Sequence, residues 1–218
     1  MPGHDDKNWL RVPPTNSDEI ATRYDDWSST YEAELVNEWR YDAPQQAAQL
    51  IASHLGPEAV AGAVVLDVGC GVGLTGRALS VVGVPTIDGV DVSARSLAMA
   101  ERTGAYRSLV CHDFNAGPLP FADGSFTVVE CVGVLSYATD PAALLADFAR
   151  VLVPGGLVVF SHRTDLWDEK GFTAVLADMH SRSLFDQVSW TEPMPYMPGN
   201  EDFADQVLVR YVSALTSS

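Results

Sequence analysis

The stretch VVLDVGCGVGLTGRAL, residues 64–79, carries glycines at spacings that suit a nucleotide cofactor. Counted from Gly71, the glycines Gly71, Gly73 and Gly76 spell G-x-G-x-x-G, and Asp91 follows twenty residues after the first of them. This spacing is typical of a dinucleotide site, in which the pyrophosphate lies over a helix N-terminus and the carboxylate binds a ribose. On this interpretation the chain binds NAD.

The same stretch fits a second interpretation that starts from Asp67. An apolar strand ends there in a carboxylate, and glycines follow at alternate positions, Gly69, Gly71 and Gly73. An acidic side chain at this place suits a cofactor with an ammonium group better than one with a pyrophosphate, and the glycines let the backbone approach a ligand closely. A dinucleotide enzyme would also need a substrate domain, for which only residues 161–218 remain. These features favour an adenosine cofactor other than NAD.

Apolar and amphipathic segments alternate along the chain and supply the elements that must position these residues. The pattern is that of a parallel sheet covered by helices, an α/β fold wound on both faces. The expected strands are residues 64–67, 86–91, 108–111, 126–132, 156–161 and 205–215. The expected helices are residues 75–82, 94–102 and 142–151.

Composition and charge narrow the class of protein. The 218 residues, 47% of them hydrophobic, can bury one substantial core, so we expect a single globular domain. The three cysteines, Cys70, Cys111 and Cys131, lack the C-x-x-C spacing of a zinc or redox site, which predicts no metal and a reduced, intracellular protein.

The net charge is −16, from 29 acidic and 13 basic residues. Proteins that bind nucleic acids gain much of their affinity from cationic contacts, so we expect neither a nucleic acid nor an acidic membrane as a partner. The opening MPGHDDKNWL has no apolar core of a signal peptide, and no apolar run is long enough to span a bilayer. We therefore expect a soluble, cytoplasmic protein.

Four segments carry a resemblance to a known family: LDVGCGVGL, GVDVS, PLPFADGSF and RVLVPGGLVVFS. They are similar, in this order, to the glycine-rich first motif, the end of the second strand, the segment before the fourth strand and the fifth-strand region of class I S-adenosylmethionine-dependent methyltransferases. RYDDWSSTYEAELVNEWRYDAP and SHRTDLW look most like the Williams-Beuren-region methyltransferase-like group. The resemblance implies a Rossmann-like, mostly parallel seven-stranded sheet with helices on both faces. It also implies methyl transfer from S-adenosylmethionine to a small-molecule acceptor by in-line displacement, with S-adenosylhomocysteine as the product.

The resemblance further implies roles for individual side chains. Asp67 would organise the amino group of the cofactor through water, and Gly69, Gly71 and Gly73 would give its methionine and ribose room against the backbone. Asp91 would accept hydrogen bonds from both ribose hydroxyls. The residues expected along the adenine and the methionine chain are Val92, Asp113, Phe114 and Val132. For the two valines, plain core packing remains an equal alternative.

Tyr24, Trp27 and Tyr31 are three and four residues apart, which places them on one face of a helix. Two interpretations remain open. The rings dock the helix on the domain, or the helix closes over the cofactor, as in related enzymes, where cation-π attraction would favour the positive sulfur. We take residues 1–45 as an amino-terminal helical lid segment and residues 46–218 as the methyltransferase domain.

Methyl transfer from a sulfonium needs alignment and desolvation more than a dedicated residue. A base is required only if the acceptor must lose a proton. The acceptor pockets of the family open after the fourth and fifth strands, which makes Tyr137, His162 and Arg163 the catalytic candidates, with Trp167 and Tyr196 as pocket walls. Two other functions stay open here: an NAD-dependent oxidoreductase and a non-catalytic module that binds S-adenosylmethionine.

Overall fold

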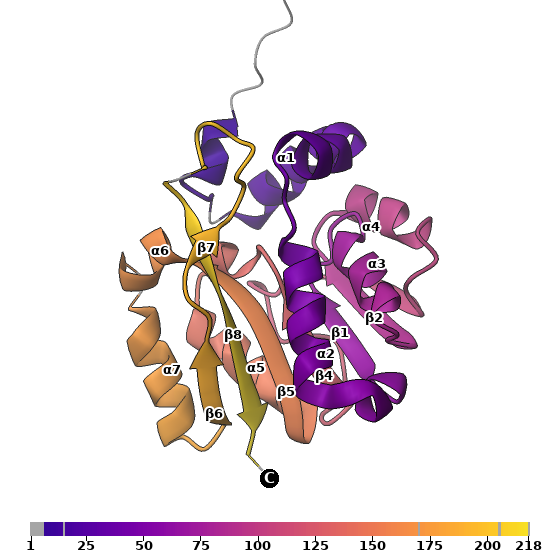
Figure 1. The fold of residues 1–218 in the computed structure, drawn as a ribbon, viewed down its shortest axis with the longest axis vertical. Helices are drawn as coiled ribbons and strands as arrows, with labels where there is room; N and C mark the ends of the chain where they lie inside the picture. Colours follow the sequence, from indigo (N-terminus) through magenta and orange to yellow (C-terminus); the bar gives the residue numbers. More distant parts are fainter. Residues whose placement is uncertain (1–6, 15, 170, 205, 218) are drawn as a thin grey trace, which may run out of the picture.

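The computed structural model describes residues 7–14, 16–169, 171–204 and 206–217. Within these ranges the chain forms one mixed sheet with helices on both sides (Figure 1). Residues 1–6 of the amino-terminal segment and Asp205, the first residue of the expected last strand, lie outside the described residues. None of the described helices is long and apolar enough to cross a bilayer.

The sheet has the strand order β3-β2-β1-β4-β5-β8-β6, and the short β7 pairs with β8. The first five strands in this order pair in parallel, whereas β8 is antiparallel to both β5 and β6. The predicted doubly wound, mostly parallel sheet is confirmed, with β7 as a two-residue addition. The strands are β1 (Val64–Val68), β2 (Thr86–Asp91), β3 (Ser108–Cys111), β4 (Phe126–Cys131), β5 (Leu152–Arg163), β6 (Phe185–Trp190), β7 (Met194–Pro195) and β8 (Leu208–Thr216).

Side-chain caps begin several of the helices. Asn16 accepts a hydrogen bond from the Glu19 amide at the start of α1, and Ser93 accepts one from the Ser96 amide at the start of α4. Such caps satisfy backbone donors that have no partner within the helix. The helices are η1 (Lys7–Leu10), α1 (Ser17–Glu32), η2 (Ala33–Glu38), α2 (Ala43–Ala61), α3 (Leu74–Val81), α4 (Ala94–Glu101), η3 (Leu135–Tyr137), α5 (Pro141–Val151), α6 (Thr164–Glu169) and α7 (Phe172–Ser181).

Alternation along the central strands divides the core into two layers. Val65 and Val128 belong to the layer that includes α2 and α3, whereas Leu66 and Val129 belong to the layer that includes α5 and α7. A strand covered on both faces is apolar at nearly every position, which explains the sequence of β1 apart from Asp67. The same alternation decides on which face each residue near the end of a strand lies.

Three regions differ from the expected elements. β5 begins at Leu152, before the Pro-Gly-Gly turn, and its pairing with β4 shifts register between Phe126 and Val128. The chain beyond β5, where the apolar periodicity weakens, forms α6, α7 and β6. Helix α2 was not expected, because Pro57 and the left-handed Gly56, with φ of 73°, kink it and divide its apolar pattern into two pieces.

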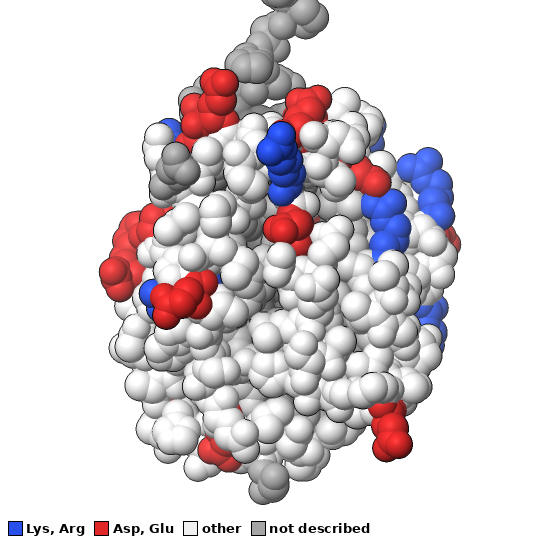
Figure 2. All heavy atoms as spheres, in the orientation of Figure 1, with Lys and Arg blue, Asp and Glu red and all other residues white. Residues whose placement is uncertain are grey.

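Neither acidic nor basic side chains form one continuous patch on the face shown in Figure 2. On the face shown in Figure 2, Asp and Glu side chains are scattered, and the Lys and Arg side chains do not gather into one basic surface. Described arginines also form ion pairs with carboxylates, as Arg77 does with Glu32 and Arg107 with Asp88. Acidic residues outnumber basic ones, 29 to 13, so such pairs leave many carboxylates without a basic partner.

Candidate functional site

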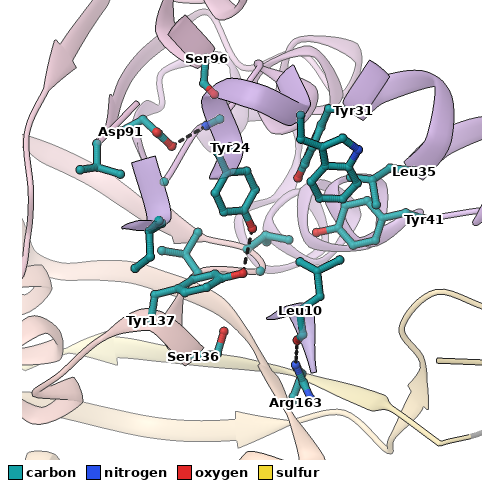
Figure 3. Close-up of a pocket in the computed structure, with 18 of the residues that line it drawn as sticks. Leu10, Tyr24, Tyr31, Leu35, Tyr41, Asp91, Ser96, Ser136, Tyr137 and Arg163 are labelled. Atoms are coloured by element: carbon teal, nitrogen blue, oxygen red, sulfur yellow. Dashed lines mark hydrogen bonds between the residues drawn. The ribbon is translucent and has the colours of Figure 1, made fainter. Parts of the chain in front are cut away.

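A cavity opens at the carboxyl ends of β1, β2 and β4, and α1 closes one side of it (Figure 3). Residues of α1 and of the loops that follow these three strands line it. Ligands of doubly wound sheets bind at this edge, where the strand order reverses. The predicted residues that line the cavity are Tyr24, Trp27, Tyr31, Gly69, Gly71, Asp91, Val92, Asp113, Phe114, Val132, Tyr137, Arg163 and Tyr196.

The glycine-rich loop, residues 69–73, follows β1 and forms the floor of the cavity. Gly69, Gly71 and Gly73 all have positive φ, at 76°, 51° and 92°. A Cβ added to Gly71 would meet no atom within 4 Å, so this residue faces open space, whereas one added to Gly69 would lie 2.3 Å from Val134 Cγ2. Gly71 therefore leaves room for a ligand against the backbone, and Gly69 lets the loop pack against the end of β4.

Asp91, the last residue of β2, connects the glycine-rich loop to the N-terminus of α4. Its Oδ2 accepts a hydrogen bond from the Gly71 amide at 2.9 Å, and its Oδ1 accepts one from the Ser93 amide at 2.8 Å. Burial raises the pKa of Asp91 above its ordinary value, although these two amides act in the opposite direction. A carboxylate has about four acceptor positions. The amides of Gly71, Ser93 and Val92 do not fill these positions, so the carboxylate keeps acceptor capacity toward the cavity.

Val92, Asp113 and Phe114 line the same side of the cavity as Asp91, beyond the ends of β2 and β3. The Oδ1 of Asp113 accepts a hydrogen bond from the Asn115 amide at 2.8 Å, which fixes the carboxylate. Its second oxygen keeps acceptor capacity for an amine. An aromatic ring and an anchored carboxylate beside each other suit an adenine, as the sequence predicts.

Gly73 does not line the cavity, which corrects its predicted contact with the cofactor. Asp67, predicted to act on the amino group of the cofactor through water, lies outside the lining as well. Asp67 is 0% exposed and lies beneath the loop, where its Oδ2 accepts a hydrogen bond from the Tyr106 hydroxyl at 2.7 Å. Gly73 begins α3, and a Cβ there would press against Thr103, Ala100 and Tyr106. The physical reason is packing: both residues support the loop from the side away from the cavity.

The aromatic face of α1 forms the roof of the cavity. The Tyr24 and Tyr137 hydroxyls are hydrogen-bonded at 2.9 Å, which connects α1 to the loop after β4 (Figure 3). Asp25, one residue further, accepts a hydrogen bond from the Ser93 hydroxyl at the start of α4. Trp27 is buried among rings, with its centroid 4.6 Å from that of Tyr31. The helix thus spans the cavity and is fixed on both sides of it.

A cluster of tyrosines extends from the roof of the cavity toward β5 and β8. We call Tyr24, Tyr31, Tyr41, Tyr137 and Tyr196 the phenol cluster. The rings of Tyr41 and Tyr196 are 5.4 Å apart, and a Cβ added to Gly133, just after β4, would lie 2.9 Å from the Tyr196 hydroxyl. Burial raises the pKa of each phenol above its ordinary value, so the cluster stays neutral.

Arg163 lines the cavity, but its guanidinium group is held by the protein itself. It pairs with Asp165 at 2.6 Å and donates hydrogen bonds to the carbonyl oxygens of Leu10 and, at 3.0 Å, Arg11 (Figure 3). Only 7% of the Arg163 side chain is exposed. Its contacts therefore fasten the segment before α1 to the end of β5, and the proposed catalytic role has no support from this geometry.

His162 and Trp167 do not reach the cavity, which corrects their assignment to the acceptor pocket. The His162 ring packs 4.3 Å from the Phe172 ring and 5.6 Å from the Trp167 ring, centroid to centroid. Successive residues of a strand point to opposite faces. Arg163 therefore faces α1, and His162 lies in the layer of α7, away from the place of a methyl acceptor.

Several residues of the site were not among the predicted ones, namely Leu10, Ser17, Ile20, Leu35, Tyr41, Ser96, Asn115, Gly133, Val134, Ser136, Met197 and Phe203. Tyr41 belongs to the YDAP sequence that carried the family resemblance, and this was the available signal for it. Met197 and Phe203 come from the loop between β7 and β8, which has no periodic pattern.

Hydrogen exchange tests whether α1 acts as a mobile roof. We expect residues 19–41 to exchange faster without S-adenosylhomocysteine than with it, because the bound nucleoside adds contacts to α1. In Arg163→Ala the segment before α1 should exchange roughly tenfold faster than in the wild type, since hydrogen bonds to a charged group are lost. Full protection without the ligand, unchanged by this substitution, would mean that α1 is a fixed part of the domain.

Comparisons with known proteins agree with this geometry. Residues 66–160 match a protein family described as "Methyltransferase domain". Human methyltransferase-like protein 27 is 34% identical over 142 residues, which are 65% of this chain and 57% of that protein. The ubiquinone biosynthesis O-methyltransferase of Thiobacillus denitrificans is 40% identical over 109 residues, which are 47% of this chain and 45% of that protein. The chain thus spans about half the length of these curated relatives.

The fold is also found among solved structures. The magnesium protoporphyrin IX methyltransferase of Synechocystis PCC 6803, solved with bound SAH, aligns with a TM-score of 0.66 at 16% identity. The alignment covers 92% of this chain and 99% of that one. At this identity the likeness concerns the arrangement of strands and helices.

Proposed function

We propose, from the premise that this chain belongs to the class I S-adenosylmethionine-dependent methyltransferases, that it transfers a methyl group from S-adenosylmethionine to a small-molecule acceptor. The observation that carries the proposal is a single cavity with two differently built sides. One side has an open glycine-rich loop and anchored carboxylates, and the other has the neutral phenol cluster. The family match also decides between the two interpretations of residues 64–79, in favour of S-adenosylmethionine over NAD.

The residues of the cofactor side fit S-adenosylmethionine. Asp91 would accept the ribose hydroxyls, Asp113 and Phe114 would bind the adenine, and Gly71 would leave room for the methionine chain. Val132, at the end of β4, would pack beside that chain. When bound, the cofactor supplies an electrophilic methyl group, and these residues orient it.

The acceptor side favours a small and uncharged molecule. The phenols are neutral, and the guanidinium of Arg163 is already paired with Asp165, so a charged acceptor would be desolvated without compensation. Residues of α1 and of the segment before it line the cavity, which leaves little access for a polymer. The chain's part in the reaction is then to exclude water and to align the acceptor atom with the methyl group.

The types of residue that line the cavity also indicate which kind of acceptor atom is methylated. Among the described residues that line the cavity there is no His, Lys or Glu, and the carboxylates Asp91 and Asp113 belong to the cofactor side. Deprotonation of an ordinary alcohol would need a base. We therefore infer an acceptor that needs none, such as an acidic ring hydroxyl, a thiol or a neutral amine. The relative from Thiobacillus denitrificans is a ubiquinone biosynthesis O-methyltransferase, which makes hydroxylated rings the first class to test.

The aromatic roof supports a division of the chain into residues 1–45 as a lid segment and residues 46–218 as the catalytic domain. Contacts from Tyr24 and Arg163 connect the two parts across the cavity. Helix α2 begins at Ala43, so it crosses the proposed boundary by a few residues. The acidic net charge, −16, supports a small molecule over a nucleic acid as the partner.

Binding and turnover measurements test the proposal in two steps. S-adenosylmethionine and S-adenosylhomocysteine should raise the melting temperature, and NAD should not. Transfer of labelled methyl from S-adenosylmethionine should then occur with at least one class among hydroxylated rings, thiols and amines. At S-adenosylmethionine concentrations below the Kd of the variant, it should fall by about ten- to a hundredfold in Asp91→Ala. Binding without transfer to any acceptor would instead favour a non-catalytic binding module.

A further inference from the structure

Two buried carboxyl groups lie side by side beneath the glycine-rich loop. Asp67 of β1 and Glu130 of β4 are register partners in neighbouring parallel strands, and each is 0% exposed. The Oδ1 of Asp67 and both oxygens of Glu130 receive no hydrogen bond from any other described group. Carboxylates only accept hydrogen bonds, so these two neighbours can bond to each other only if one of them carries a proton.

Tyr106, from the loop before β3, fastens this pair to the glycine-rich loop and to α3. Its hydroxyl donates to Asp67 Oδ2 at 2.7 Å and accepts from the Gly76 amide at 3.0 Å. The ring fits only because glycines surround it: a Cβ added at Gly76 would lie 2.3 Å from Tyr106 Cζ, and one at Gly89 would lie 3.0 Å from its Cδ1. Gly76 therefore admits a tyrosine that holds Asp67, and not the pyrophosphate of a dinucleotide.

The surroundings of the two carboxyl groups offer no positive charge. None of the ion pairs in the described part of the chain includes either of them. The titratable groups that face them from the packed elements are Tyr106 before β3, Asp91 of β2, Cys70 of the glycine-rich loop, Cys131 of β4 and Tyr211 of β8. All of these are neutral or negative, so only a proton relieves the repulsion of the pair.

We propose that Asp67, Glu130 and Tyr106 hold one shared proton as a lock on the glycine-rich loop, and that cofactor affinity falls when rising pH removes it. The proposal rests on the proposed function only for the identity of the cofactor. Glu130 and Tyr106 are positioning residues, since neither lines the cavity. Two negative charges in adjacent strands would push the ends of β1 and β4 apart, and Gly69 and Gly71 continue directly from the first of these ends.

The direction of the pH dependence follows from the burial of Asp67 and Glu130. Burial raises the pKa of Asp67 to about 7 and holds the pKa of Glu130 well above its usual range. The pair is fully protonated in acid and loses a first proton as the pH rises through about 7, the pKa of Asp67. The remaining proton stays on Glu130, beside the ionised Asp67, and is lost only at higher pH. The free energy of unfolding should fall over the interval from about pH 4 upward, because the folded chain keeps protons that the unfolded chain releases there.

Calorimetry with S-adenosylhomocysteine as the probe tests the lock. In the wild type the Kd should rise about tenfold between about pH 7 and the highest pH at which the protein stays folded, where Glu130 loses the shared proton. In Glu130→Gln the amide donates to Asp67 at every pH and one charge is gone, so the Kd should stay within about twofold over the same range. Tyr106→Phe removes a donor that stabilises the Asp67 carboxylate, so the fall in affinity should move to higher pH.

A Kd that is constant in the wild type, or an equal slope in Glu130→Gln, overturns the proposal. A Kd that falls with rising pH, with proton release on binding, also overturns it, because Asp67 would then pair with the ammonium group of the cofactor. Histidines ordinarily titrate near neutral pH, so His112→Gln is the control and should keep the wild-type profile. If S-adenosylhomocysteine binds at no pH, the proposed function fails, and the pH dependence of unfolding in wild type and Glu130→Gln still decides the lock.

Discussion

Asp91→Ala is expected to weaken S-adenosylhomocysteine binding by about ten- to a hundredfold. Hydrogen bonds to a charged group contribute roughly 1.5 to 3 kcal/mol, and the substitution removes the proposed acceptor of both ribose hydroxyls. It also removes the bonds from the Gly71 and Ser93 amides, so the loop loses an anchor at the same time. Titration calorimetry on the folded variant measures the effect.

Two further variants separate the loss of the ribose contact from the effect of a changed net charge. Glu101→Ala, at the exposed end of α4, changes the net charge equally and should leave the affinity within about twofold. Asp91→Asn retains one acceptor oxygen and should fall between the wild type and Asp91→Ala. Unchanged affinity in a folded Asp91→Ala protein would mean that the ribose site has been assigned to the wrong strand end.

Gly76→Ala is expected to lower the free energy of unfolding by about 2 to 3 kcal/mol. In an open helix the same substitution stabilises by roughly 1 kcal/mol, so the sign itself is informative. Here the new Cβ would lie 2.3 Å from Tyr106 Cζ and 2.5 Å from its hydroxyl oxygen. The ring must move, which adds overpacking strain and breaks its hydrogen bond to Asp67. Chemical denaturation measures the change.

A double-mutant cycle shows whether Tyr106 is the cause. In a Tyr106→Ala background the space is empty, so Gly76→Ala should become neutral or slightly stabilising. Gly117→Ala, where a Cβ would meet no atom within 4 Å, serves as the control and should change stability by less than about 0.5 kcal/mol. If Gly76→Ala stabilises the wild-type protein, Tyr106 does not occupy the position described.

Much of the fold and of the cofactor side could be predicted because the signals are local. Each of the first five strands is a short apolar run that ends in a turn, and a parallel sheet places all their carboxyl ends at one edge. Asp91 ends one of these strands and Asp113 comes two residues after another, so their place at the cavity required only the order of the strands. The left-handed turns of the loop after β1 are likewise encoded by its glycines.

The residues of the acceptor side and those that support the glycine-rich loop could be predicted only in part from the sequence, because they depend on packing between distant segments. Alternation along β5 implies that His162 and Arg163 point to opposite faces, but only the packed layers decide that Arg163 faces α1. The spacing G-x-G-x-x-G is equally ambiguous, because Gly76 serves a ring thirty positions later in the chain.

The amino-acid sequence by itself therefore determined the class of fold, the resemblance to the class I methyltransferases and the edge of the sheet at which the cofactor side lies. The tertiary structure alone decided that Tyr41 and Tyr196 meet at the end of β4, and that Glu130 lies against Asp67. The physical reason is that periodicity and turn residues act over a few positions, whereas burial and hydrogen-bond partners depend on which segments pack together in three dimensions.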